Sequence, residues 1–209
     1  MKKYNKNLEL LTRNHIYSRE MEHDACGVGL IASTEGKKSR IVVDYGIEAL
    51  KAVWHRGAVD ADGKTGDGAG IHLEVPKDFF IEKIQVTGHD YDNSEICVGM
   101  IFLPRNDYSS QESCKTIVES ELTKSNFSIY GWRQVPVNPK VLGEKAERTR
   151  PEITQVLFKH NDKKLSNKNL EVKLYESRRK IEKEASIINL NDFYICSFSS
   201  KSIIYKGMF

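Results

Sequence analysis

Apolar and polar residues alternate along this chain with two different periods, which predict strands and helices in turn. Six segments have the β-branched, apolar composition of strands. They are residues 27–32, 40–43, 71–75, 96–103, 129–137 and 153–158. Two further apolar segments, residues 193–198 and 203–205, follow one another closely enough to predict a closing hairpin.

Four other segments have the spacing of helices. Ile47, Leu50 and Trp54 recur at helical spacing, and Gly57 is expected to end that helix. The other helices are expected over residues 78–84, 109–122 and 170–185. Strands that occur in pairs, with helices following them, predict an α+β layered fold rather than a regular βαβ repeat.

Composition excludes several classes of protein. The chain has 209 residues, enough for a sizeable core, and its 32 basic and 29 acidic residues give a net charge of +3. This surplus is too small to argue for a nucleic-acid partner. The longest apolar run, residues 96–103, is too short to span a membrane, and no secretory signal precedes it.

The four cysteines are widely spaced, without a CxxC pair. They therefore predict neither a disulfide scaffold nor a zinc site, and a cytoplasmic location is expected. Cys97, Cys114 and Cys196 lie in apolar segments and are expected in the core. Cys26, at the start of a predicted strand, could be either a buried small residue or a nucleophile. His23 and Asp24 precede it, but no further ligands follow at metal spacing, so no metal is expected.

A glycine-rich loop over residues 60–70 is the strongest local signal for function. It fails the phosphate-loop pattern because Ala58 stands where glycine is needed, and Ile71 breaks the dinucleotide pattern. Lys64 and Thr65 break the calcium-loop pattern. The glycines still permit positive φ and close backbone approach, so a functional loop and a surface turn remain equally open.

The most basic stretch, residues 159–184, carries nine basic and five acidic side chains. It has no nucleic-acid-binding motif and little aromatic interleaving. A solvated helix face is the expected interpretation.

Several segments together resemble one family, in the same order along essentially the whole chain. Cys26-Gly27 and His55-Arg56-Gly57 resemble class II glutamine amidotransferases in general, and the other segments resemble the glutaminase domain of the glutamate synthase large subunit. The matching segments are residues 23–29, 55–58, 65–71, 131–136, 141–143, 150–151 and 200–208.

The resemblance implies an N-terminal-nucleophile hydrolase fold, a four-layer α/β/β/α sandwich that is incomplete in this chain. It implies that residues 1–25 are a propeptide, cleaved between Ala25 and Cys26, and that residues 26–209 are the N-terminal part of the amidotransferase domain. Cleavage would turn the Cys26 amide into an amine of pKa about 7.7–8.0, which can accept the thiol proton. Cys26 would then attack the side-chain amide of glutamine.

The family also implies the rest of the reaction. Ammonia passes to a site where it combines with 2-oxoglutarate to form a second glutamate. That site uses FMN and an iron–sulfur cluster in the complete enzyme, with no cofactor in this chain. The expected partners are glutamine, the remainder of the large subunit, and either ferredoxin or a small NAD(P)H-oxidising subunit, with neither nucleic acid nor membrane.

Five residues are expected to support the site beside Cys26. Gly66 and Gly68, like Gly70, lack a Cβ and would let the backbone approach the nucleophile, and Asp67 lies between them. Arg56, with Gly57 beside it, is expected either to order the same corner or to cap the end of its helix.

The chain also departs from the family. It contains no Asn-Gly pair for an oxyanion hole, so we expect a fragment of a much longer enzyme, with little glutaminase activity alone. Two alternatives stay open: another class II amidotransferase, such as the phosphoribosylamine-forming enzyme, and a non-catalytic interaction module with the same fold.

Overall fold

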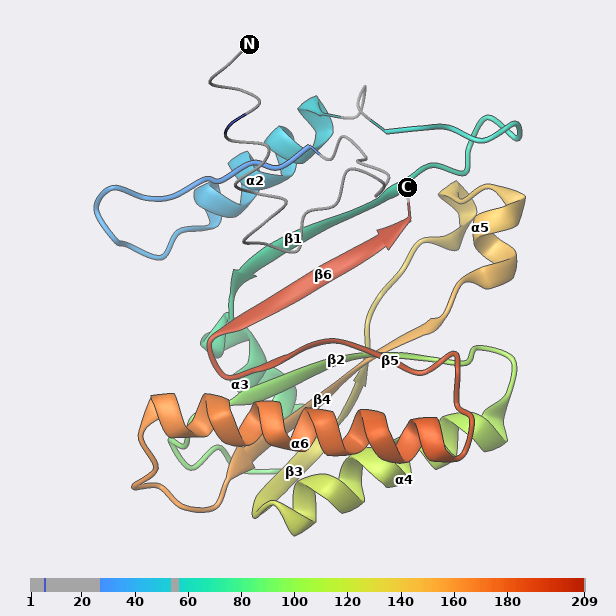
Figure 1. Cartoon of the computed structure of the whole chain (residues 1–209). Helices are drawn as coiled ribbons and strands as arrows, with labels where there is room; N and C mark the ends of the chain where they lie inside the picture. Colours follow the sequence, from blue (N-terminus) through green and yellow to red (C-terminus); the bar gives the residue numbers. More distant parts are fainter. Residues whose placement is uncertain (1–5, 7–26, 54–56, 209) are drawn as a thin grey trace.

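The computed structural model describes residues 6, 27–53 and 57–208, and its centre is an antiparallel four-stranded sheet. The strand order is β3-β4-β2-β5. The strands are β2 (Cys97–Leu103), β3 (Phe127–Gln134), β4 (Glu152–His160) and β5 (Tyr194–Ser199). Helices α4 (Tyr108–Lys124) and α6 (Asn167–Ile187) cover one face of this sheet (Figure 1).

A second, two-stranded sheet lies on the other side. It pairs β1 (Gly68–Glu74) with β6 (Ser202–Met208) antiparallel, with Ile71 opposite Tyr205. Helix α2 (Arg40–Ala52) lies against β1, and α3 (Lys77–Val86) follows β1 in the chain. The order α2, β1–β6, four-stranded sheet, α4 and α6 is the α/β/β/α layering expected from the sequence (Figure 1).

Strand β2 explains why the apolar run is continuous. Ile101 and Leu103 join the core between the sheet and the helices α4 and α6, whereas Val98 and Met100 join a second core that contains Phe80 of α3. A strand that is buried on both faces needs apolar residues at every position rather than at alternate ones. The expected strand at residues 96–103 is therefore confirmed.

Two expectations near the N-terminus are wrong. Residues 40–43 form the first turn of α2, because Ser39 acts as the N-cap and its Oγ accepts a hydrogen bond from the Ile41 amide at 3.3 Å. Residues 27–32 form no strand, and Val28 and Leu30 are about nine-tenths exposed. β-Branched composition misled both predictions, since a helix start and an exposed segment can carry the same residues.

The expected closing hairpin is also wrong, because β5 and β6 belong to different sheets. The turn between them is held by Glu171 of α6. Its carboxylate accepts hydrogen bonds from the Ser200 amide at 2.9 Å, the Ser200 hydroxyl at 2.7 Å and the Ser199 hydroxyl at 2.9 Å. Anchored in this way, the chain leaves the four-stranded sheet and pairs with β1.

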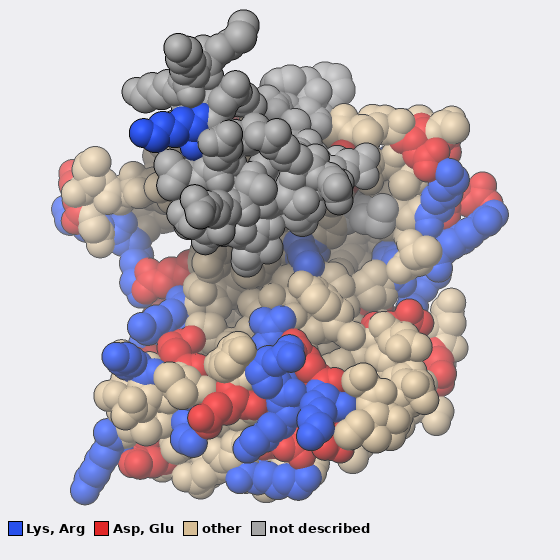
Figure 2. All heavy atoms as spheres, in the orientation of Figure 1, with Lys and Arg blue, Asp and Glu red and all other residues tan. Residues whose placement is uncertain are grey.

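The basic stretch forms most of α6 and is a solvated face, as expected. Its charges pair locally, with Lys173 bound to Glu176 and both Arg178 and Arg179 bound to Glu182. Figure 2 shows acidic and basic side chains interleaved over this helix.

Two short helices between β3 and β4 were not predicted from the sequence. They are η2 (Pro139–Val141) and α5 (Glu144–Thr149). Neither is long enough to show an apolar repeat, and Ala146 is the one buried residue of the pair.

Candidate active site

The expected site residues divide between the described and undescribed parts of the chain. Ala25, Cys26 and Arg56 lie outside the described residues. Gly57, Gly66, Asp67 and Gly68 are described, and Gly68 opens β1.

Residues 58–67 form a small antiparallel hairpin. Val59 and Gly66 pair as an isolated bridge, and the Asp60 amide donates to the Thr65 carbonyl at 2.7 Å. At the base, the Asp67 amide donates to the Ala58 carbonyl at 3.2 Å, and the Asp67 carboxylate accepts from the Ala58 amide at 2.8 Å. Asp67 therefore closes the loop with both its backbone and its side chain.

The tip of the hairpin is built around Asp62. Its carboxylate accepts hydrogen bonds from the Thr65 hydroxyl at 2.5 Å, the Thr65 amide at 2.7 Å and the Lys64 amide at 2.9 Å. Gly63 completes the turn with φ of +68°, a conformation that favours glycine. Gly66, Gly68 and Gly70 do not have positive φ, so the turn explains only one of the loop's four glycines.

The hydrogen bonds at this tip predict how it responds to pH. The Thr65 hydroxyl first, and then the Thr65 and Lys64 amides, lower the pKa of Asp62 to about 2 from its ordinary value of 3.8. Because the folded pKa is depressed, the ionised carboxylate supports the tip above about pH 4 and loses this effect as the pH falls towards 2. In an NMR titration, we expect the Asp62 carboxyl to show a midpoint near 2, and the Thr65 amide to shift with it. A midpoint near 3.8 would mean that these hydrogen bonds do not form in solution.

Helix α5 holds this hairpin from outside. Lys145 Nζ lies 2.7 Å from the Asp60 carboxylate, and this interaction is the main cause of the lowered pKa of Asp60. Gly143, the N-cap of α5, leaves no room for a side chain, since an added Cβ would overlap Thr65 Oγ1 and Asp62 Oδ2. Neither contact could be predicted from the sequence, because each joins residues about 80 positions apart.

Gly70 is required by close approach rather than by a turn. A Cβ added at Gly70 would lie 2.8 Å from the Tyr205 carbonyl oxygen and 2.9 Å from Lys206 Cβ on the paired strand. The structure thus supports the expectation that the loop's glycines permit close backbone approach, here between β1 and β6.

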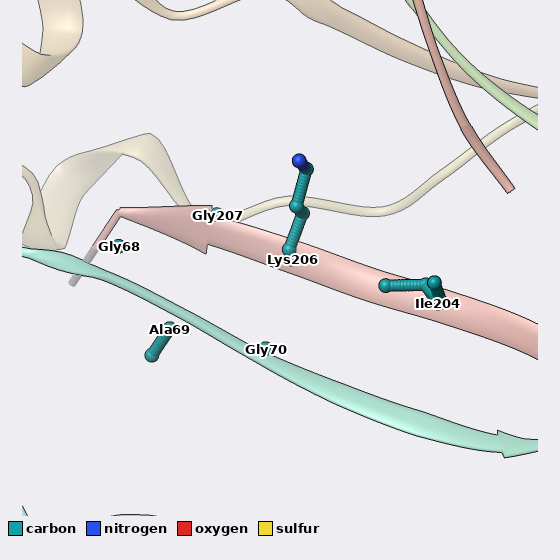
Figure 3. A pocket seen from close by; sticks show the side chains of 6 residues that line it. All are labelled: Gly68, Ala69, Gly70, Ile204, Lys206 and Gly207. Carbon is teal, nitrogen blue, oxygen red and sulfur yellow. The ribbon is translucent and has the colours of Figure 1, made fainter. Parts of the chain in front are cut away.

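Strands β1 and β6 also border a hollow of about 360 Å³. Its lining is mostly small residues: Gly68, Ala69, Gly70, Ile204, Lys206 and Gly207 (Figure 3). Lys206 is its charged residue, and its Nζ donates to the Tyr194 hydroxyl at 2.8 Å. The hollow therefore offers accessible backbone rather than a free charged side chain, and the glycines of residues 65–70 were the sequence signal for it.

The three described cysteines are core residues, as expected. Cys97 and Cys114 are fully buried, and Cys196 is 6% exposed. Burial raises the pKa of the Cys114 thiol to about 11, and it raises the pKa values of Cys97 and Cys196 as well. A thiol with a raised pKa is a poor nucleophile at neutral pH, so these three cysteines are not candidates for catalysis.

Within the described residues, no three His, Cys, Asp or Glu side chains come together in a way that could hold a metal ion. The buried thiols lie on β2, α4 and β5, so these residues do not fit an iron–sulfur cluster. Across the same residues, no helix combines the length and apolarity needed to cross a bilayer.

Comparison with known proteins identifies the family. Residues 26–209 match the family of Glutamine amidotransferases class-II. The chain is 56% identical over 203 residues to the glutamate synthase (NADPH) large chain of Azospirillum brasilense, covering 97% of this chain and 13% of that protein. It is 40% identical over 203 residues to the ferredoxin-dependent glutamate synthase of Pyropia yezoensis, with 95% and 13% covered.

A further relative is the chloroplastic ferredoxin-dependent glutamate synthase of Spinacia oleracea, 38% identical over 190 residues, with 90% of this chain and 12% of that protein covered. The chain thus spans 12 to 13% of the length of these relatives. The family match covers most of the chain, and we conclude that this chain belongs to the class II glutamine amidotransferases.

Proposed function

We propose that this chain is the nucleophile-bearing part of the glutaminase domain of a glutamate synthase, with Cys26 as the nucleophile. The observation that carries this proposal is the position of the family match, which begins at Cys26. The 56% identity to a glutamate synthase over nearly the whole chain supports the choice within the family.

Activation of Cys26 requires removal of residues 1–25. An ordinary cysteine thiol has a pKa of about 8.5, so only a few per cent is thiolate at pH 7. While Ala25 is attached, the Cys26 nitrogen is an amide and cannot act as a base. Cleavage yields an α-amine with a pKa of about 7.7–8.0, which takes the thiol proton directly or through one water molecule.

The reaction then proceeds in two steps. The Cys26 sulfur bonds to the side-chain amide carbon of glutamine, the C–N bond breaks, and ammonia leaves with the proton that came from the thiol. Water next attacks the glutamyl thioester, which releases glutamate and returns the proton to the sulfur. Gly66, Asp67 and Gly68 support this centre by bringing backbone close to it, and Arg56 and Gly57 belong to the same corner.

The ammonia is passed on to 2-oxoglutarate, and reduction gives a second glutamate. The residues of this chain supply no step of that reduction, for which the complete enzyme uses FMN and an iron–sulfur cluster. The identity is 56% to an NADPH-type relative and 40% to a ferredoxin-type one, which favours a small NADPH-oxidising subunit as the electron donor. The three cysteines in the described part of the chain are free thiols, which agrees with a reducing, cytoplasmic setting.

The alternative enzyme, the phosphoribosylamine-forming amidotransferase, has no support from the relatives reported above, which are all glutamate synthases. A non-catalytic interaction module would differ in its chemistry. It would keep residues 1–25, and its Cys26 would be inert.

Maturation and labelling test this proposal directly. We expect the intact mass of the complete enzyme, purified from its host, to show loss of residues 1–25. A glutamine-derived electrophile such as a diazoketone should then add one equivalent per chain, and peptide mapping should place it on Cys26. The matched control is Cys196→Ser, which should label like the parent. Retention of residues 1–25 in an enzyme that hydrolyses glutamine, or labelling at another residue, would contradict the proposal.

A further inference from the structure

Described residues from three segments that resemble the family meet at one place in the structure. The hairpin of residues 58–67 follows the His55-Arg56-Gly57 segment and leads into the glycines of β1. The third segment, residues 141–143, packs its Gly143 against the tip of that hairpin. Residues 141–143 have no role in the proposed reaction. They also lie outside both hydrophobic cores, so core packing does not account for them either.

We propose that Gly143 and Lys145 are positioning residues for glutamine hydrolysis, acting through the hairpin. This inference rests on the proposed function. Gly143 sets how closely the hairpin approaches α5, and Lys145 fixes its lateral position through the ion pair with Asp60.

The contact at Gly143 is unusually restrictive. A Cβ there would overlap Asp62 Oδ2 and Thr65 Oγ1, and would lie 2.6 Å from the Thr65 backbone nitrogen. A flexible side chain could move away, but the Thr65 backbone belongs to the turn and cannot move alone. Thr65 is 7% exposed, so this side of the turn packs against the protein, whereas Asp62, Gly63 and Lys64 are exposed to solvent.

Hydrogen bonds connect the tip of the hairpin to its base. The Asp60 amide bonds to the Thr65 carbonyl, and Asp67 bonds to Ala58 through both backbone and side chain. These bonds carry any displacement of the tip to residues 57 and 68, where the chain enters the segments with the expected site residues.

Gly27, which follows Cys26 in the sequence, lies next to the end of α2 in the structure. A Cβ on Gly27 would be 3.3 Å from Val53 Cβ, at the C-cap of α2. Val53 precedes Gly57 by four positions in the sequence, so Gly27 lies beside the end of α2, shortly before the hairpin begins. We expect a shift of the hairpin to displace Gly66, Asp67 and Gly68, the described residues proposed to support Cys26, without removing any group proposed to contact glutamine.

Substitution of Gly143 by alanine tests the displacement of the hairpin without other changes. Gly143 has φ −72° and ψ 163°, an extended conformation that alanine adopts without strain, so the substitution tests only the space for Cβ. In the complete enzyme, we expect Gly143→Ala to lower kcat for glutamine hydrolysis by about 10²-fold, as expected for a displacement near 1 Å, with a smaller change in KM. Turnover with ammonia in place of glutamine should stay at the parental level.

Lys145→Ala tests the lateral contact with a milder change. Arg148→Ala is its matched control, because Arg148 lies on the same helix and its ion pair within the described part of the chain is with Glu144 of that helix. We expect Lys145→Ala to lower kcat by about two- to fivefold, Lys145→Arg to restore it, and Arg148→Ala to leave it unchanged. Hydrogen exchange of the Thr65 and Asp67 amides should accelerate in Lys145→Ala but not in Lys145→Arg or Arg148→Ala.

The outcomes separate this inference from the proposed function. If the parent enzyme hydrolyses no glutamine, the proposed function fails, and hydrogen exchange still tests the contact between α5 and the hairpin. If Gly143→Ala keeps kcat within about twofold of the parent, or loses ammonia-dependent turnover equally, the positioning role is wrong. Equal effects of Lys145→Ala and Arg148→Ala would also overturn it.

Discussion

Cys26→Ala is expected to lower glutamine-dependent glutamate formation by about 10⁴-fold or more, the effect of removing a catalytic nucleophile. Without the sulfur no thioester can form, and nothing else in the described residues replaces it, because the other cysteines are buried with raised pKa values. Glutamate formation with added ammonia should be retained. The measurement is steady-state turnover of the complete enzyme with each nitrogen donor.

The ammonia reaction is the internal control for folding, and Cys196→Ala is the control for loss of a thiol elsewhere. Cys196 is a core residue of β5, so this variant should keep both activities. Two results would contradict the expectation. One is substantial glutamine-dependent turnover by Cys26→Ala, and the other is loss of both activities together, which would assign Cys26 to the core rather than to catalysis.

The parts of the fold that the sequence predicted are those where burial decides the pattern. Helices α4 and α6 were expected because Val118 and Leu122, like Leu174 and Ile181, recur on the face that packs on the sheet. In segments exposed to solvent, the pattern of apolar residues did not distinguish a strand from a helix. Residues 40–43 read as a strand from their composition, but the Ser39 N-cap and the helical spacing that continues to Leu50 place them in α2.

The pairing of β5 with β2 and of β6 with β1 could not be predicted locally. Two apolar segments joined by a short polar turn predict a hairpin, and the deciding feature is Glu171, about 30 residues earlier in the chain. Its three hydrogen bonds fix the turn in a form that sends the strands to different sheets.

The candidate site likewise combines features that the local sequence indicated with contacts to distant residues that it could not indicate. The density of glycines in residues 60–70 agrees with close approach of the backbone, and the structure gives two of them a specific cause. Gly63 has positive φ, and Gly70 faces the backbone of β6. The partners of the loop, Gly143 and Lys145, could not be inferred, because the short helix α5 has no apolar repeat to place it.

The second large effect is expected in the core, at Gly99 of β2. This residue pairs with Val156 of β4 and Phe198 of β5. A Cβ there would lie 2.7 Å from Val156 Cγ1 and 2.8 Å from the ring atoms of Phe198. Both neighbours are packed in the core under α4 and α6, so neither can move away freely.

Gly99→Ala should therefore destabilise the chain by about 1–3 kcal/mol, even though alanine is otherwise preferred to glycine inside a strand. For a chain of this length, this corresponds to a fall in Tm of about 2–12 °C. Thermal unfolding followed by circular dichroism measures it. Gly207→Ala on β6 is the matched control, because none of the described residues lies within 4 Å of its added Cβ, and its Tm should not fall.

A second substitution tests the cause of this loss. Phe198→Leu removes part of the ring that an alanine at position 99 would contact, so the double variant should lose less stability than the sum of the two single variants. Strict additivity would place the strain elsewhere. A Tm for Gly99→Ala at or above that of the parent would show that Val156 and Phe198 can move to accommodate the added methyl group. Gly99 would then not be needed for the close packing of β2 between β4 and β5.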